Sequence, residues 1–413
     1  MNEPKLRFPE FKDIWNNHKI EDMFDRVGTP VDLDDTLTYR EIGIRSHGKG
    51  IFHKDETTAS EIGNKRVFWV EPDCFVVNIV FAWERAVAKT TEAENGMIAS
   101  HRFPMYKPKK DVVDLDYITE YFITKRGQNV LILASPGGAG RNKTLGQKEF
   151  AKSVVKLPSL PEQQKIAEFL STIDTVIEKQ KETVSAWEER KKGVMQKLFS
   201  QEVRFKADDG SDFPDWEEKS FSDVFENLNN STFSRDCLNY EAGNVKYIHY
   251  GDILTKFGFA IDVQSSNVPY VNDDLDCEKY ASLSDGDIVI ADTAEDDTVG
   301  KAVEIMNTHC GKTISGLHTI ACHPKEKFAS KYLGYFMNAD IYHNQLRPYM
   351  QGIKVTSVSK TNIALTKILI PCLAEQQKIA DCLSLLDEVI EKQKATLAAW
   401  EELKKGLLQQ MFV

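Results

Sequence analysis

The segment Pro136–Thr144 (PGGAGRNKT) combines glycines with a Lys-Thr pair, the residue types of a phosphate-binding loop. A P-loop requires a glycine directly before the lysine, because the backbone N–H groups there cradle the phosphates. This segment has Asn142 at that position, so it does not predict nucleotide hydrolysis. Its last four side chains are of the types that contact phosphate oxygens and base edges of nucleic acids: Arg141, Asn142, Lys143 and Thr144.

Residues of the same types occur at other points of the chain. Arg and Lys suit phosphates and guanine, whereas Asn and Gln suit adenine. The further candidates for contact with DNA are Arg102, Lys107, His249, Tyr250, Arg347, Gln351, Lys354 and Thr356. The adjacent His-Tyr pair follows a predicted strand, where it either faces a groove of DNA or ends a core strand. For the basic candidates, a solvated charged surface is the alternative.

Three other motifs resemble reactive sites but do not predict chemistry in this chain. Asn267–Tyr270 (NVPY) resembles the Asn-Pro-Pro-Tyr motif of adenine methyltransferases, but valine replaces a proline and no glycine-rich S-adenosylmethionine loop precedes it. The acidic run Asp292–Asp297 lacks the spacing of a calcium loop; it is either a solvated loop or the source of one carboxylate for cytosine N4. A group of His and Cys residues lacks zinc-ligand spacing: His309, Cys310, His318, Cys322 and His323. We therefore predict no catalytic residue and no metal site.

Charge is distributed unevenly along the 413 residues. The net charge of −11 argues against binding nucleic acid over the whole surface. Residues 101–160, however, carry 11 Lys and Arg against 5 Asp and Glu, and residues 301–371 carry 9 against 3. No stretch is long and apolar enough to predict a membrane span, and the seven scattered cysteines fit reduced thiols in a cytoplasm. We expect a cytoplasmic protein with two basic regions and no membrane partner.

A duplicated framework must position these candidate residues. Residues 161–199 and 374–412 align without a gap, and 25 of the 39 aligned positions are identical. Each copy predicts one long helix, since prolines lie at or before its start and apolar residues recur in alternating steps of four and three. The apolar residues predicted to form the helix–helix contact are Ile166, Leu170, Ile173, Ile177, Val184 and Trp187 in the first copy, and Ile379, Leu383, Leu386, Ile390, Leu397 and Trp400 in the second.

Steps of four and three are typical of a coiled coil, so each helix needs a partner. At ~1.5 Å per residue, each helix is roughly 58 Å long, which exceeds the width of a small domain. We predict that the two copies pack against each other, because segments of one chain have a high effective concentration for each other. Pairing with another chain is the alternative. Lys191 and Lys404 are polar residues within this contact and would fix its register.

The two domains that adjoin the helices match each other only faintly in sequence, and both read as mixed α/β. The predicted strands are Arg66–Val70, Cys74–Phe81 and Asn129–Ala134 in the first domain, and Val245–Tyr250, Asp287–Ala291, Lys301–Ile305 and Thr366–Ile370 in the second. Asp114–Thr124 and Phe328–Met337 predict amphipathic helices at equivalent places. Near-identical helices beside divergent domains suggest one role for the helices and two different roles for the domains.

The order domain, helix, domain, helix resembles the specificity subunit of type I restriction–modification systems. Leu157–Ile166 (LPSLPEQQKI) and Ile370–Ile379 (IPCLAEQQKI), which open the two helices, carry this resemblance. Gly286–Ile290, Val299–Ala302 and Gln351–Thr356 also resemble parts of a target-recognition domain of that family. The resemblance covers nearly the whole chain. It implies an α+β (mixed α/β) fold: two globular target-recognition domains related by a pseudo-twofold axis and separated by two long helices that form an antiparallel coiled coil.

The resemblance also implies boundaries and partners. The divisions are target-recognition domain 1 (1–157), conserved spacer helix 1 (158–200), linker and target-recognition domain 2 (201–370), and conserved spacer helix 2 (371–413). Each domain would read one half of a bipartite, asymmetric site in double-stranded DNA, while the helices set the spacing and dock methyltransferase subunits, two of them, together with restriction/translocase subunits. The chain would be non-catalytic and hold no cofactor, since S-adenosylmethionine, ATP and Mg²⁺ belong to partner subunits. The alternatives are a coiled-coil adaptor that does not read DNA, or a methyltransferase in its own right.

Overall fold

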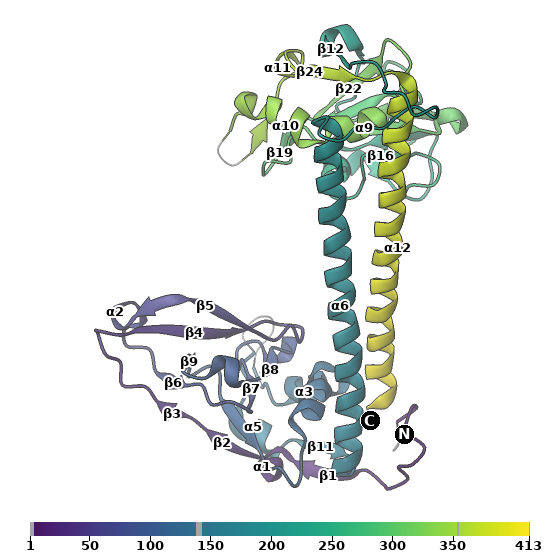
Figure 1. The fold of residues 1–413 in the computed structure, drawn as a ribbon. Helices are drawn as coiled ribbons and strands as arrows, with labels where there is room; N and C mark the ends of the chain where they lie inside the picture. The colour runs from purple at the N-terminus through teal and green to yellow at the C-terminus, as the bar shows by residue number, and fades with distance from the viewer. Residues whose placement is uncertain (1–3, 138–142, 353–354, 413) are drawn as a thin grey trace. The chain divides into compact units, whose positions relative to one another are not determined.

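The computed structural model of the chain describes residues 4–137, 143–352 and 355–412. The chain divides into two compact units. Unit 1 comprises Met1–Glu182 and Ala395–Val413, and unit 2 comprises Thr183–Lys394. Each unit therefore contains one mixed α/β domain together with a part of each long helix (Figure 1). The mixed α/β fold with two domains and two long helices is as predicted.

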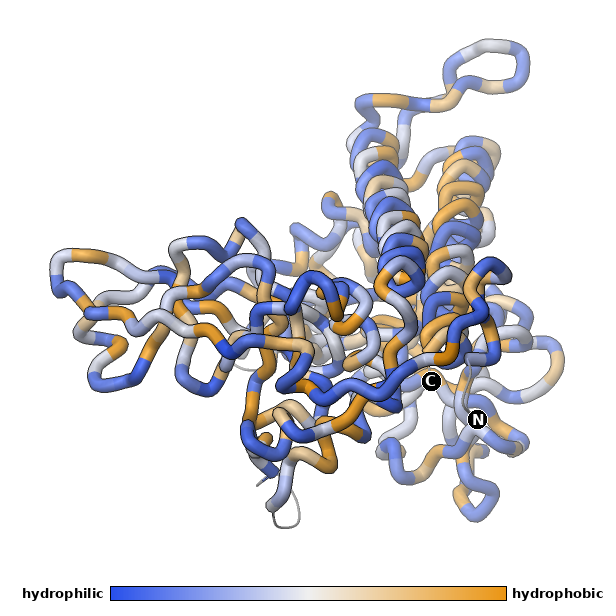
Figure 2. The backbone as a smooth tube through the Cα atoms, turned by 90° about the horizontal axis from the view of Figure 1, so that it is seen from below, coloured by the Kyte–Doolittle hydropathy of each residue, from blue (hydrophilic) through white to orange (hydrophobic). Residues whose placement is uncertain are grey.

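The two long helices are α6 (Leu160–Phe199) and α12 (Leu373–Met411). In unit 1 the beginning of α6 packs in one hydrophobic cluster with the end of α12, and in unit 2 the end of α6 packs with the beginning of α12. The helices therefore run antiparallel within each unit. Hydrophobic and hydrophilic residues alternate along both helices (Figure 2), as expected for helices with one buried face.

Eight of the twelve apolar residues predicted for the helix–helix contact are buried: Ile166, Leu170, Ile173, Ile177, Val184, Ile379, Leu383 and Ile390. The other four are half-buried: Trp187, Leu386, Leu397 and Trp400. Several of these residues also contact the adjoining domain, because the clusters that hold them extend into the domain cores. The long helices are thus part of each domain's core as well as of the helix pair.

The two lysines within the contact each meet an aspartate of the opposite helix. Lys191 Nζ lies 2.5 Å from Asp387 Oδ1 in unit 2, and Lys404 Nζ lies 2.7 Å from Asp174 Oδ1 in unit 1. The two pairs occupy matching positions of the duplicated sequence. A charge that finds its partner in only one alignment of two helices fixes their register, so each unit carries one such constraint.

The Glu-Gln-Gln motif that opens each helix ties the helix to its own domain. Glu162 and Glu375 are fully buried, and each receives two hydrogen bonds from one guanidinium group, that of Arg7 (2.7 and 2.8 Å) and that of Arg204 (3.0 and 2.8 Å) respectively. A buried carboxylate needs such a partner because its desolvation is otherwise costly. In unit 2 the indole Nε1 of Trp216 also donates to Glu375 (3.0 Å).

The following glutamine completes this attachment. Gln163 donates to the carbonyl oxygens of Val112 and Pro158, and Gln376 donates to that of Pro371. The side-chain oxygen of each glutamine accepts a backbone N–H from its domain, that of Asp114 in unit 1 (3.0 Å) and of Ala329 in unit 2 (2.9 Å). These bonds explain why both copies retain the same polar residues at a buried helix start.

The domain of unit 1 begins and ends on a two-stranded ladder and contains two further sheets. The strands, in sheet order, are β1 (Asn16–Lys19) and β11 (Val154–Leu157); β2 (Phe24–Val27), β10 (Met105–Pro108), β7 (Phe75–Val77) and β8 (Val87–Lys89); and β3 (Thr29–Pro30), β6 (Val67–Trp69), β9 (Ile98–Ser100), β4 (Thr38–Ile44) and β5 (Ile51–Thr58). The helices are α1 (Ile20–Met23), α2 (Ala59–Ile62), α3 (Leu115–Ile123), α4 (Lys125–Leu133) and α5 (Gln147–Lys152), with 3₁₀ turns η1 (Ala82–Glu84) and η2 (Glu92–Glu94).

The domain of unit 2 is built in the same way with additional strands. Its strands, in sheet order, are β12 (Glu217–Ser220) and β24 (Lys367–Ile370); β13 (Phe225–Asn227), β22 (Thr319–Pro324), β18 (Ile288–Ala291), β20 (Ala302–Met306) and β16 (Ala260–Asp262); β14 (Leu238–Asn239), β17 (Tyr270–Val271), β15 (Val245–Ile248) and β21 (Lys312–Ser315); and β19 (Thr293–Ala294) and β23 (Thr356–Ser357). The helices are α7 (Phe221–Val224), α8 (Tyr250–Thr255), α9 (Tyr332–Met337), α10 (Asp340–Leu346) and α11 (Lys360–Ile363), with 3₁₀ turns η3 (Arg235–Cys237), η4 (Thr308–Cys310) and η5 (Arg347–Tyr349).

One sheet has the same topology in both units. In unit 1 the order β2-β10-β7-β8 is antiparallel throughout, and in unit 2 the order β13-β22-β18-β20 repeats it. The paired residues place Phe24 opposite Pro108 in unit 1 and Phe225 opposite Pro324 in unit 2. Positions of the two domains can therefore be matched residue by residue along this sheet, although their sequences have diverged.

The predicted strand Asn129–Ala134 is wrong, because most of these residues belong to helix α4. Thr124 caps this helix: its side-chain oxygen accepts the backbone N–H of Gly127 (3.1 Å). Leu131 is buried whereas Leu133 is 82% exposed, so the apolar run covers one face of a helix. Four consecutive apolar residues do not distinguish a short strand from a helix segment. The other predicted strands and both amphipathic helices appear at the expected places, shorter than predicted except for Lys301–Ile305, which is shifted by one residue to Ala302–Met306.

Candidate nucleic-acid interface

The candidate residues of unit 1 meet where strand β7 ends. The backbone N–H of Ile79, just beyond the strand, donates to the carbonyl of Arg102 (3.0 Å), and the carbonyl of Ile79 accepts from the N–H of Leu145 (2.8 Å). Residues 102 and 145 are far apart in sequence, so this pair of bonds brings together two predicted groups. Arg102 and the segment with Lys143 and Thr144 are thus both held to the chain just beyond β7.

Unit 2 contains the same pair of bonds at matching positions. The backbone N–H of Asp292, just beyond β18, donates to the carbonyl of His318 (3.1 Å), and the carbonyl of Asp292 accepts from the N–H of Val358 (2.9 Å). Ile79 and Asp292 are 213 residues apart, as are Leu145 and Val358, and this is also the offset of the long helices. We call this pair of backbone hydrogen bonds the frame: residues 79, 102 and 145 in unit 1, and residues 292, 318 and 358 in unit 2. The frame is duplicated, while the side chains that it presents differ.

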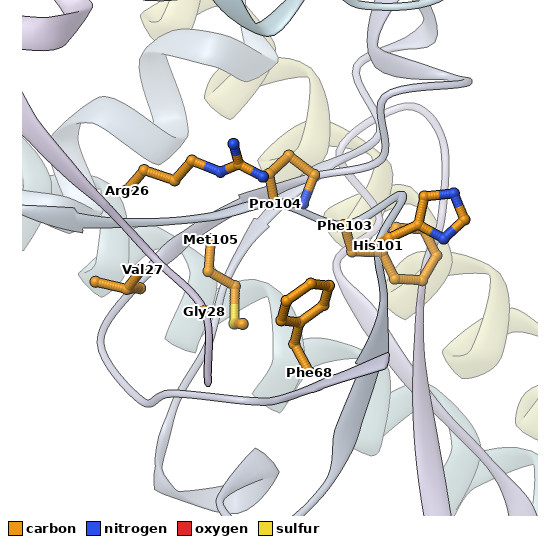
Figure 3. Close-up of a pocket in the computed structure, with 8 residues that line it drawn as sticks. All are labelled: Arg26, Val27, Gly28, Phe68, His101, Phe103, Pro104 and Met105. Carbon is orange, nitrogen blue, oxygen red and sulfur yellow. The ribbon is translucent and has the colours of Figure 1, made fainter. Parts of the chain in front are cut away.

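Exposed basic side chains surround this frame in unit 1. Arg102 and Thr144 are exposed and Lys143 is half-buried. His101 and Arg26 are also exposed and stand at the mouth of a pocket of about 270 Å³ (Figure 3). The structure does not add Lys107 to this group, because its ammonium donates to the carbonyl of Pro72 (2.6 Å) and thereby ties β10 to the turn before β7.

An aromatic stack adjoins the frame in unit 2. The rings of His249 and Tyr250 are stacked with centroids 4.7 Å apart, and the Tyr250 ring contacts His318 edge-on at 5.4 Å. His318 Nδ1 in turn lies 3.4 Å from Thr293 Oγ1 and 3.5 Å from Asp292 Oδ1. The predicted His-Tyr pair thus reaches the segment around Asp292 through His318. His249 itself is buried, so the accessible polar and aromatic surface is formed by Tyr250, His318 and Asp292.

The second group predicted in unit 2 joins this surface through β23. Thr356 pairs with Ala294 and Ser357 with Thr293, and Gln351 forms an antiparallel bridge with Ser357. Gln351 is exposed and Thr356 is half-buried. Arg347, in the exposed η5 turn, begins the same loop. Arg141, Asn142 and Lys354 were also predicted to contact DNA, and they lie outside the described residues.

Electrostatics decides which of these groups can act as donors. Burial, followed by the charge of Arg235, lowers the pKa of His249, so this ring is neutral near pH 7. Its Nδ1 accepts the backbone N–H of Gly251 (3.0 Å), which places the ring proton on Nε2. Arg235 itself forms a bidentate pair with the buried Asp252 (2.7 and 2.8 Å) and is therefore committed to the fold.

The acidic run divides into residues with different roles. Asp296 accepts the N–H and the hydroxyl of Thr298 (3.0 and 2.5 Å), and these bonds hold its pKa below the usual value, so it is an ionised turn residue. Asp292 lies on the frame beside His318 and accepts from Thr293 Oγ1 (2.8 Å). Its carboxylate is placed to accept from a base amine such as cytosine N4.

Sequence reasoning missed three residues that the fold brings to these surfaces. Arg26 and His101 come from the end of β2 and from the turn before β10, and His318 comes from the turn before β22. His318 adopts a left-handed backbone conformation (φ 55°), which orients the chain as it enters the strand. The strands beside these residues, β2, β10 and β22, were not among those predicted from the sequence, so no local pattern pointed to them.

Two searches of the described residues gave no site of another kind. In the part of the chain that the structure describes, no group of three or more His, Cys, Asp or Glu side chains could hold a metal ion. Among the same residues, none of the helices is long and apolar enough to cross a bilayer.

Comparison with known proteins gives a consistent result. The model of the family described as "Type I restriction modification DNA specificity domain" matches residues 72–185 and 214–399. The putative type I restriction enzyme MjaX specificity subunit of Methanocaldococcus jannaschii is 22% identical over 434 aligned positions, which cover 98% of this chain and 95% of that protein. The type I restriction enzyme MjaVIII specificity subunit of the same organism is 23% identical and covers 84% of this chain and 80% of its own length.

Solved structures share the fold. A chain from a study titled "Structural basis underlying complex assembly and conformational transition of the type I R-M system" superposes with a TM-score of 0.58, at 14% identity, and covers 98% of this chain and 99% of its own. The type I restriction–modification system S subunit from M. genitalium superposes with a TM-score of 0.53, also at 14% identity, and covers 100% and 99%. At this level of identity the superpositions support the architecture.

Proposed function

The chain belongs to the type I restriction modification DNA specificity family, and from this membership we propose that it reads a bipartite, asymmetric site in double-stranded DNA, with one half read by each unit. The observation that carries the proposal is the duplicated backbone frame around Ile79 and Asp292. Both units hold a sheet end, a turn and a loop together by the same bonds, and each presents different side chains there. One frame with two side-chain sets suits two half-sites of unequal sequence.

The side chains support different modes of readout in the two units. In unit 1, Arg102, Lys143 and Arg26 would contact phosphates or the N7 and O6 atoms of guanine. In unit 2, Tyr250 offers an aromatic face and Asp292 offers a carboxylate, which suit base stacking and a cytosine amine. The overall charge of −11 is compatible with this function because residues 101–160 and 301–371 carry an excess of Lys and Arg, and partner subunits would supply further positive charge.

Methylation mapping tests this function directly. The chain would be expressed with its cognate methyltransferase, and the modified sites in the host genome would be sequenced. We expect one split motif. Arg102→Glu should change or abolish the half that unit 1 reads, while His318→Ala should relax the other half, because each residue lies on only one frame. Lys110→Glu, an exposed charge change at the other end of β10, serves as the control. Methylation without sequence preference would refute the proposal.

The long helices present two matching grooves that support the docking of two identical partners. In unit 1 a groove of about 750 Å³ lies between the helices and the α3–α4 turn, and in unit 2 a groove of about 680 Å³ lies between the helices and the β16 and α9 region. Six helix positions line both grooves and are identical in the two copies: Asp174, Ile177, Glu178, Lys181, Glu401 and Lys404 in unit 1, and Asp387, Ile390, Glu391, Lys394, Glu188 and Lys191 in unit 2. We assign one methyltransferase subunit to each groove.

Native mass spectrometry would count the docked subunits. Glu401 and Glu188 are about half exposed, so their replacement by arginine should leave each unit folded. Each single variant, Glu401→Arg or Glu188→Arg, is expected to bind one methyltransferase subunit, and the double variant none. Two bound subunits in the double variant would refute this placement, without bearing on DNA readout.

The remaining parts of the proposal follow from the family. The chain is non-catalytic, the helices set the distance between the half-sites, and restriction/translocase subunits join the same complex in the cytoplasm. S-adenosylmethionine, ATP and Mg²⁺ are assigned to the partner subunits. Isolated chain incubated with labelled S-adenosylmethionine and DNA should transfer no methyl group; transfer by the isolated chain would assign catalysis to it instead.

A further inference from the structure

A pocket of about 270 Å³ opens beside the frame of unit 1, and the frame residues do not use it. Strand β2 and the start of β10 form one wall, and β6 supplies the other through the ring of Phe68 (Figure 3). The exposed side chains of Arg26 and His101 stand at the mouth, and the other lining side chains are apolar, although polar atoms contribute to the lining as well. The lining residues are Arg26, Val27, Gly28, Phe68, His101, Phe103, Pro104 and Met105.

Gly28, the residue between β2 and β3, lines the pocket with its backbone. A Cβ atom added at Gly28 would meet the Phe68 ring at 3.4 Å, so a larger side chain would project into the space. The backbone of Gly28 is not in the left-handed region, so its conformation does not require glycine. The absence of a side chain at this position therefore leaves space beside Phe68 and is not required by the backbone.

The matching position of unit 2 is closed. The register of β2 with β10 and of β13 with β22 aligns Gly28 with Asn229. The Asn229 side chain donates to the carbonyl of Lys279 (3.2 Å), and its own carbonyl accepts from Ala281 (3.3 Å), so another segment covers this edge. The pocket is therefore present in unit 1 and absent at the equivalent position of the same sheet in unit 2. A difference in specificity between the two units would arise at such a position.

The two polar groups at the mouth are available to a ligand. Among the residues that the structure describes, the side chains of Arg26 and His101 make no hydrogen bond or ion pair, whereas neighbouring cations are engaged: Lys107 with the Pro72 carbonyl, and Lys109 with Asp25 and with the Glu21 carbonyl. Exposed donors above an apolar interior suit a flat ring with a polar edge. The volume lies just below the ~300 Å³ at which sites for larger ligands begin, which matches a single ring system.

We propose that this pocket takes one nucleobase turned out of the duplex within the half-site of unit 1, an inference that rests on the proposed DNA-reading function. Base edges inside a duplex are flush with the groove and are reached by side chains that protrude, so they do not fill a concave pocket. An extruded base does protrude. Phe68 supplies a stacking face, and Arg26 and His101 supply donors to the base edge, the combination by which extruded bases are held.

A mismatch scan tests the proposal. Extrusion requires breaking one base pair, so a mispaired base is extruded at lower cost. The complex of this chain with its methyltransferase would be titrated against duplexes carrying its mapped site, each with one mismatch in the half-site of unit 1. The methyltransferase extrudes the base that it modifies, so the methylated position is left out of the comparison. Among the other positions of this half-site we expect a single one at which the mismatch tightens binding about tenfold or more, while the remaining mismatches weaken binding.

Variants connect that position to the pocket. Gly28→Leu should fill the space and lose the gain, so that it binds the mispaired and paired duplexes within about twofold of each other. Phe68→Leu keeps an apolar residue but removes the aromatic face, so it should lose most of the gain. This variant tests the pocket independently if Gly28→Leu folds poorly. Lys110→Ala, exposed at the opposite end of β10, should keep the gain. Thermal unfolding and selectivity for the half-site of unit 2 report whether each variant is folded.

The possible outcomes distinguish a failure of the pocket proposal from a failure of the DNA-reading function. If no mismatch tightens binding by the wild-type complex, or if both pocket variants keep the gain, the pocket does not hold a base. If the wild-type complex does not prefer its mapped site over unrelated duplex, the DNA-reading function itself fails. A gain that disappears in both pocket variants and persists in the lysine control supports the assignment.

Discussion

Replacing Lys404 with methionine should destabilise unit 1, and more strongly at high pH than at low pH. Lys404 Nζ lies 2.7 Å from Asp174 Oδ1 and 3.3 Å from Glu120 Oε1, and its side chain is 20% exposed. Burial raises the pKa of Glu120, and Lys404 is the charge that opposes this most strongly. Methionine fills a similar volume without the charge, so the variant leaves the Glu120 carboxylate buried without a counterion.

The magnitude follows from the burial of the two carboxylates. Removing one partner of a buried ion pair costs about 3–5 kcal/mol, whereas an exposed pair is worth about 0–1 kcal/mol. The side chain of Glu120 is 17% exposed, but that of Asp174 is 43% exposed and is partly screened by water. We therefore expect the free energy of unfolding to fall by about 2–3 kcal/mol near neutral pH.

The pH dependence has a definite sign. Without Lys404, the pKa of Glu120 in the folded chain rises further above its value in the unfolded chain. Between those two values the folded state binds more protons, so the free energy of unfolding falls as the pH rises through that window. Each added unit of pKa shift costs about 1.4 kcal/mol at a pH above both values. The variant should therefore be closer to wild type at pH 5 than at pH 8.

Urea unfolding at pH 5 and pH 8 measures both effects, and hydrogen exchange in α3 and at the end of α12 assigns them to unit 1. Lys405→Met is the matched control, because Lys405 is the next residue, is 64% exposed and, among the residues that the structure describes, forms its ion pair with Glu402 at the surface (3.0 Å). Glu120→Gln in the Lys404→Met background should remove most of the pH dependence. If Lys404→Met is no more destabilising than Lys405→Met, or equally destabilising at both pH values, the reasoning is wrong.

Three further predictions concern single residues. Arg102→Ala should weaken DNA binding by the complex and reduce the slope of log affinity against log salt by about one, as measured by titration at several salt concentrations. Gly127→Ala should lower the free energy of unfolding of unit 1 by about 1–3 kcal/mol in urea titrations, because the new Cβ would lie 2.2 Å from the Tyr121 carbonyl oxygen, whereas Gly258→Ala, with no atom within 4 Å, should have little effect. Burial raises the pKa of Glu304 to about 7, so the free energy of unfolding of unit 2 should fall by about 3 kcal/mol as the pH rises from about 4.5 to about 7, and Glu304→Gln should abolish this fall in urea titrations.

The long helices were predictable because their signal is repeated many times. Each copy repeats apolar residues in steps of four and three over its whole length, and 25 of the 39 aligned positions are identical in the two copies. No secondary structure other than a long helix fits this pattern. The lysines within the contact were recognised as register-setting residues, but their partners were not. Asp174 and Asp387 read as ordinary solvent-facing residues of an amphipathic helix, and only the antiparallel alignment places them opposite Lys404 and Lys191.

The domains were harder to predict because their elements are short and depend on tertiary contacts. Residues 129–134 look like a strand and form part of α4, since a capping threonine and the close approach of Gly127 to the preceding helix determine the local structure. The longest hairpin, β4 with β5, was not predicted because β5 is largely polar (IFHKDETT) and its exposed face carries the charged residues. Burial by neighbouring strands, which a local pattern does not report, decides such cases.

The candidate interface shows why fold and specificity can change separately in this chain. The bonds that join residue 79 to residues 102 and 145, and residue 292 to residues 318 and 358, use only backbone N–H and carbonyl groups. Any residue except proline can supply the N–H, so the side chain at each position is free to change without loss of the frame. Arginine at 102 corresponds to histidine at 318, and isoleucine at 79 corresponds to aspartate at 292. Under the proposed function, a surface built in this way would acquire a new half-site through side-chain substitutions alone, while the buried glutamates and glutamines at the helix starts keep the attachment to the long helices unchanged.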